Sequence, residues 1–73
     1  MIKREKLEAK IRNNPRNVSL ENFEALIKQY GHIEEGGRHP KAIFGNEMYP
    51  YKRENPIKPA YVKGLLELID SLK

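Results

Sequence analysis

One histidine flanked by basic residues is the feature of this chain best suited to chemistry. His39 lies two residues before Lys41, and the pair Gly45-Asn46 further on is typical of a two-residue β-turn. Counting outward from that turn places His39 opposite Lys52. Alternation of side chains then puts His39, Lys41 and Lys52 on one face of a β-hairpin. Neighbouring ammonium groups favour a neutral imidazole, which can accept a proton near pH 7.

This grouping suits the cleavage of an RNA phosphodiester. The imidazole would activate a ribose 2′-hydroxyl, and Lys41 and Lys52 would hold the phosphate and stabilise its developing charge. Arg38, Arg53 and Lys58 would extend the same basic track outward.

Ordinary explanations also exist for these side chains, because a single histidine on a short strand is most often a surface residue. His32 follows a predicted helix end, where it complements the helix dipole. Glu34, Glu35 and His39 are close in sequence but lack a recognised ligand spacing, and cysteine is absent. We therefore expect no metal and no cofactor.

The composition supports a small basic domain. The chain has 73 residues, of which 14 are Lys or Arg and 10 are Asp or Glu, giving a net charge of +4. Residues 36–63 alone hold six basic and two acidic groups. A basic surface favours polyanions, nucleic acid first among them. We expect one domain spanning residues 1–73, without a membrane span or signal peptide and located in the cytoplasm.

Two helices are predicted in the first half of the chain. Leu7 and Ile11 share a face of a helix over residues 3–12, which Pro15 prevents from continuing. Ser19 is a favourable N-cap for a second helix that runs to Tyr30. Gly31 is then expected to adopt a left-handed C-cap conformation.

The hydrophobic period changes after residue 31. Strands are predicted over residues 32–35, 39–44 and 47–52, with Pro50 either placing the third at a sheet edge or ending its pairing early. A last helix begins near Pro59, and Gly64 within it allows close packing on the sheet. The core face of the hairpin is predicted to carry Ala42, Phe44, Tyr49 and Tyr51. The fold class is α+β, an α-α-β-β-β-α two-layer sandwich with a three-stranded antiparallel sheet and helices on one face.

Several segments of the chain resemble the HicA family of toxins, the mRNA interferases of toxin–antitoxin pairs. The resemblance covers nearly the whole length. It is carried by Lys6-Leu7, by residues 17–23 and on to Tyr30-Gly31, by Gly-Gly-Arg-His at 36–39, by residues 49–53, and by residues 57–62 and on to Leu65-Leu66.

The resemblance implies a double-stranded-RNA-binding-domain-like fold and a metal-independent endoribonuclease. It implies that His39 is the catalytic residue, that mRNA is the substrate, and that a HicB-type antitoxin covers the site. This chain departs from the family at Arg38, where serine is typical.

Two other functions remain open from the residues alone. A non-catalytic RNA-binding module could use the same basic sheet, with His39 as a mere contact. A protein-interaction domain could instead use Ile43 and Met48, which the predicted register leaves exposed near the turn.

Overall fold

The computed structural model describes residues 3–73, with side chains from Lys6 onward, and its element order is the one predicted. The helices are α1 (Lys3–Asn13), α2 (Leu20–Tyr30) and α3 (Pro59–Leu72). The strands are β1 (His32–Glu34), β2 (Lys41–Phe44) and β3 (Glu47–Pro50). They form one antiparallel sheet in the order β1-β2-β3.

The start of α2 follows the sequence signal. The Ser19 hydroxyl accepts a hydrogen bond from the Asn22 backbone N–H at 3.1 Å, which satisfies one of the free amides of the first turn. Val18 just before the cap and Phe23 in the second turn are both buried, as a hydrophobic staple requires. The helix therefore begins where the cap predicts.

The predicted left-handed cap at Gly31 is wrong. Gly31 has φ −163°, an extended value that does not require glycine. A Cβ at this position would lie 2.0 Å from the Ile43 carbonyl oxygen. Glycine is needed here because the end of α2 approaches β2 too closely for any side chain.

The hairpin register is the predicted one. Phe44 pairs with Glu47, Ile43 with Met48, Ala42 with Tyr49 and Lys41 with Pro50. Gly45 has φ 63°, the positive value that a tight hairpin turn uses. Pro50 lies on the edge strand β3, also as predicted.

The strands are shorter than predicted, and His39 and Lys52 lie outside them. The Tyr51 N–H still donates to the Pro40 carbonyl at 3.2 Å, but Pro40 has no N–H with which to continue the ladder. Regular pairing therefore stops at Lys41 and Pro50. β1 likewise ends one residue early, at Glu34.

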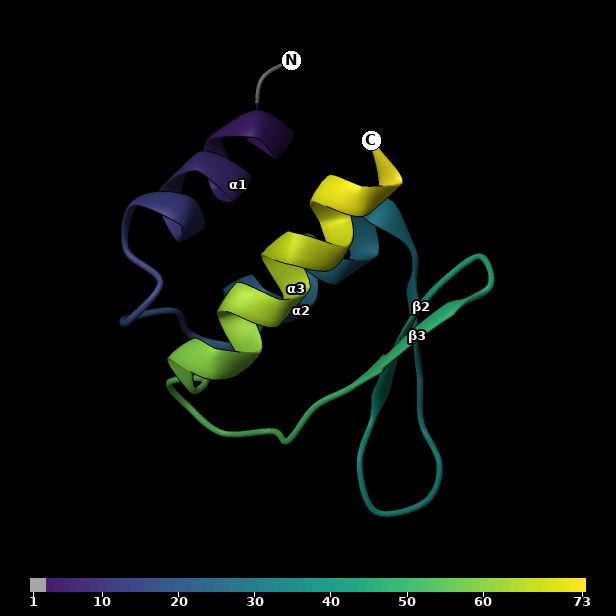
Figure 1. The fold of residues 1–73 in the computed structure, drawn as a ribbon. Coiled ribbons are helices and arrows are strands. Elements are labelled where there is room, and N and C mark those ends of the chain that lie inside the picture. Colours follow the sequence, from purple (N-terminus) through teal and green to yellow (C-terminus); the bar gives the residue numbers. More distant parts are fainter. Residues whose placement is uncertain (1–2) are drawn as a thin grey trace.

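The core lies between the sheet and the helices (Figure 1). Buried side chains come from α2, α3 and one face of the hairpin: Phe23, Leu26, Ile27, Val62, Leu65, Ile69, Ala42 and Phe44. Tyr51 is 1% exposed and packs edge-on against Phe23, whereas Tyr49 is half-buried. The predicted core face of the hairpin is thus confirmed.

Helix α3 approaches β3 closely at Gly64. A Cβ there would lie 2.2 Å from the Tyr49 hydroxyl oxygen, and that hydroxyl donates to the Tyr61 carbonyl at 3.0 Å. The prediction that Gly64 permits close packing on the sheet is confirmed. None of the helices within residues 3–73 is both long and apolar enough to span a membrane.

Candidate active site

Four of the six predicted site residues meet at an open hollow of about 380 Å³ beyond the ends of β1, β2 and β3: Arg38, His39, Lys52 and Arg53. Two chain segments line it. The loop between β1 and β2 contributes residues 35–40, and the segment after β3 contributes Lys52 and Arg53. The hollow therefore lies at the end of the sheet opposite the Gly45-Asn46 turn, where the 35–40 loop projects (Figure 1).

The 35–40 loop owes its shape to two glycines and one proline. Gly36 has φ 137° and Gly37 has φ 70°, which are backbone conformations that side chains other than glycine rarely adopt. Pro40 at the end of the loop is buried, whereas Arg38 and His39 are exposed. The loop is thus anchored at Pro40 and presents Arg38 and His39 to solvent.

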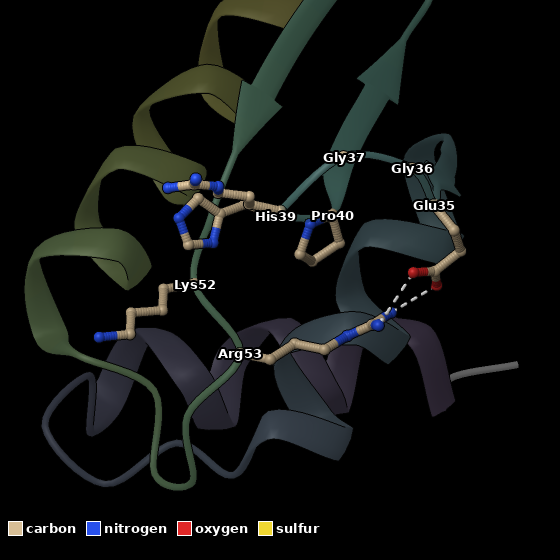
Figure 2. Close-up of a pocket in the computed structure, with 8 residues that line it drawn as sticks. Glu35, Gly36, Gly37, His39, Pro40, Lys52 and Arg53 are labelled. Atoms are coloured by element: carbon tan, nitrogen blue, oxygen red, sulfur yellow. Dashed lines mark hydrogen bonds and ion pairs between the residues drawn. The ribbon is translucent and has the colours of Figure 1, made fainter.

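The segment after β3 brings Lys52 to the same place. The bond from the Tyr51 N–H to the Pro40 carbonyl extends the hairpin by one contact and leaves Lys52 level with His39. Figure 2 shows the His39 ring and the Lys52 side chain on one side of the hollow. The two residues that the register placed opposite each other therefore do share a site, although neither belongs to a strand.

Arg53 lines the hollow but is already paired. Its Nε donates to Glu24 Oε2 at 2.7 Å, and its Nη1 and Nη2 donate to the two carboxylate oxygens of Glu35 at 2.9 and 2.6 Å. Figure 2 shows Arg53 reaching across to Glu35, away from His39. These hydrogen bonds, that to Glu35 first, raise the pKa of Arg53, and Arg53 in turn lowers the pKa of Glu35.

The other basic residues differ in their surroundings. Lys52 Nζ lies 3.4 Å from Glu54 Oε2 in an exposed ion pair, a kind that contributes little to stability. Arg38 and His39 have no ion pair or side-chain hydrogen bond within the part of the chain that the structure describes. Lys41 and Lys58 do not line the hollow: Lys41 is half-buried on β2, and Lys58 is the N-cap residue of α3.

Sequence reasoning missed Glu24 and Tyr51 as supports of the site. The Tyr51 hydroxyl donates to Glu24 Oε2 at 2.6 Å, and burial together with this bond raises the pKa of Tyr51. Glu24 lies on α2, 27 residues before Tyr51 and 29 before Arg53. No spacing rule links residues so far apart, so the sequence held no signal for this network.

The open face of the hairpin also carries apolar side chains, and the predicted exposure is confirmed for Met48 but not for Ile43. Met48 is 57% exposed and Ile43 is half-buried. Among residues 6–73 there is no group of three or more His, Asp or Glu side chains that could hold a metal ion.

No family model matches the chain, and no curated protein and no solved structure matches it either.

Proposed function

We propose that the protein is a HicA-like mRNA interferase with a double-stranded-RNA-binding-domain-like fold, in which His39 is the catalytic residue. The observation that carries the proposal is the group of side chains at the rim of the hollow, Arg38, His39 and Lys52. There, an exposed imidazole lies in the same hollow as Arg38 and Lys52, which come from two different chain segments, and among residues 6–73 it has no carboxylate partner.

The proposed reaction uses the ribose itself as the nucleophile. His39 takes the proton of the 2′-hydroxyl, and the 2′-oxygen forms a bond to phosphorus. The bond between phosphorus and the 5′-oxygen breaks, that oxygen takes a proton from water, and the hydroxide so formed takes the proton back from His39. Arg38 and Lys52 hold the non-bridging phosphate oxygens as negative charge develops on them. The products are a 2′,3′-cyclic phosphate and a free 5′-hydroxyl.

The proposed partners follow from the same resemblance. The substrate is single-stranded mRNA, which we expect to be bound with little sequence preference. A HicB-type antitoxin protein would cover the hollow, and the exposed Met48 face lies on the same hairpin as a further contact surface. Neither a metal nor a cofactor has a role in the proposed reaction.

The test is cleavage of a labelled RNA by purified protein in the presence of EDTA. We compare wild type with His39→Gln, which cannot act as the base, and with His32→Gln as the matched control. His32 is also exposed but starts β1 and does not line the hollow. Wild type and His32→Gln should cleave equally, whereas His39→Gln should bind RNA and leave it intact.

Two outcomes contradict the proposal. If His39→Gln cleaves as fast as wild type, His39 is not catalytic. If wild type binds RNA but leaves it intact, the protein is the non-catalytic RNA-binding module of the same fold.

A further inference from the structure

We propose that Arg53 is a positioning residue, which fixes the 35–40 loop and thereby His39, and that it is not an RNA contact. This inference rests on the proposed function for its catalytic part, although its structural part can be tested separately. It replaces the sequence-based prediction that Arg53 belongs to the phosphate track.

The loop is held at both ends by two residues of one short segment, Tyr51 and Arg53. At its start, both oxygens of Glu35 accept hydrogen bonds from the Arg53 guanidinium at 2.6 and 2.9 Å. At its end, the Pro40 carbonyl accepts from the Tyr51 N–H. Such two-point arginine–carboxylate pairing fixes direction as well as distance. Pairing of Glu34 with Lys41 in the β1–β2 ladder already brings the two loop ends together, and the segment after β3 fixes each end beyond that pair.

Glu24 connects this arrangement to the core. Its Oε2 accepts both from the Tyr51 hydroxyl at 2.6 Å and from Arg53 Nε at 2.7 Å. Glu24 lies on α2 between buried residues, and Tyr51 is itself 1% exposed. Arg53 is thereby held by a rigid helix on one side and holds the loop on the other.

The middle of the loop cannot order itself by packing. A Cβ placed on Gly36 or Gly37 would meet nothing within 4 Å, so the space where a side chain would stand is open on both residues. Glycines also have the largest backbone freedom. The position of His39, two residues after Gly37, therefore depends on the anchors at Glu35 and Pro40.

The charges argue against phosphate binding by Arg53. One guanidinium faces two carboxylates, those of Glu24 and Glu35, so the group as a whole carries a net charge of about −1. Its Nε, Nη1 and Nη2 all already donate to carboxylate oxygens. A phosphate approaching Arg53 would find only two of its five N–H donors free and would be repelled by the two carboxylates, whereas Arg38 has no carboxylate partner among the residues described.

The test compares Glu35→Ala with Glu34→Ala, neighbouring residues of equal charge. Both side chains are exposed, but only Glu35 contacts Arg53. We would measure backbone order parameters of residues 36–39 by ¹⁵N relaxation, and kcat and KM for RNA cleavage. In Glu35→Ala the order parameters should fall from about 0.85 toward 0.6. The kcat should fall about 10-fold, because misplacing a catalytic group slows the chemical step, while KM changes little.

Glu34→Ala should resemble wild type in both measurements, which controls for the lost negative charge. Arg53→Lys keeps the positive charge but loses the planar two-point hydrogen bonding of the guanidinium. Its order parameters and its kcat should therefore lie between those of wild type and Glu35→Ala. Unchanged order parameters in Glu35→Ala would overturn the inference. A mobile loop with an unchanged kcat in Glu35→Ala would also overturn it. A change in KM alone would do the same. If wild type cleaves no RNA, the proposed function fails, and a loosened loop in Glu35→Ala alone would still support the positioning of the loop by Arg53.

Discussion

Two charged regions of this molecule use their charges in opposite ways. Where the three helices meet, Glu8 accepts hydrogen bonds from the Tyr30 hydroxyl, from Arg12 at 2.7 Å and from Lys73 at 2.9 Å. Arg12 also reaches Asp70 at 2.7 Å. At the hollow, by contrast, Arg38 and His39 have no such partner among the residues described.

The difference separates charges that hold the fold together from charges that are free to bind. The Glu8 cluster joins α1, α2 and α3, and the Glu8 side chain is only 12% exposed. Two cations there meet two carboxylates, so no net charge is left to attract a ligand. The Arg53 guanidinium is likewise paired, with two carboxylates, whereas Arg38 at the same hollow has no ion pair among the residues described. The number of basic residues alone does not tell paired charges from charges that are free to bind.

The comparison predicts its largest effect at His39. Expression of wild type in a bacterium should arrest growth and degrade total mRNA, whereas His39→Ala should do neither. Removal of a general base typically lowers the rate about 10²–10⁴-fold. The melting temperature should stay near that of wild type, because the exposed His39 packs against nothing in the core. Growth arrest by both proteins would show that toxicity does not depend on His39.

Glu8→Ala should lower stability and leave activity unchanged, the reverse of what we expect for His39→Ala. It leaves Tyr30, Arg12 and Lys73 without their common acceptor, so we expect a loss of about 1–2 kcal/mol in the free energy of unfolding. Chemical denaturation measures that loss, and cleavage of RNA by the remaining folded protein should be unchanged. Lower activity without lower stability would mean that the two regions are not separate.

The acid stability of the protein should depend on the same carboxylate. Hydrogen bonding from Tyr30, with further help from Lys73 and Arg12, lowers the pKa of Glu8 from 4.5 to about 2. Because the folded-state pKa lies below the unfolded one, this stabilisation is complete above pH 4.5 and is lost as the pH falls through 2. Unfolding free energies measured between pH 2 and 5 should fall less steeply in Glu8→Gln than in wild type. Equal slopes would contradict the assignment.

The smallest expected effect concerns Arg38. Arg38→Met should weaken RNA binding a few-fold and reduce the slope of log affinity against log salt by about 0.7, because one phosphate contact is lost on a single strand. Lys10→Met is the matched control, since Lys10 is exposed on α1 and does not line the hollow. Equal slopes for the two variants would show that Arg38 makes no phosphate contact.

Local signals predicted most of the fold. Ser19 fixes the start of α2, and Gly45-Asn46 fixes the hairpin register and hence which side chains reach the core. Each of these signals spans only a few residues, and one buried face per strand allows a single register. The ends of the strands were predicted too far out because Pro40, which cannot donate to the ladder, was placed inside a strand.

The site was predicted only in part. The hairpin register brought His39 and Lys52 together, and Arg38 and Arg53 followed as their neighbours in the chain. The partners of Arg53 could not be predicted, because an ion pair leaves no periodic pattern and Glu24 is 29 residues away. The reason for glycine at position 31 could not be predicted either, because it is the close approach of the distant Ile43 carbonyl and not the backbone angles of Gly31.

The central claim is that the ribose 2′-hydroxyl attacks the phosphate under the action of His39. The most direct measurement uses a DNA oligonucleotide with one ribonucleotide at its centre, incubated with wild type and with His39→Gln in EDTA. Wild type should cut once, directly 3′ of the ribonucleotide, leave a cyclic phosphate there, and leave the all-DNA strand intact. Cutting of the all-DNA strand, or equal cutting by both proteins, would contradict the mechanism.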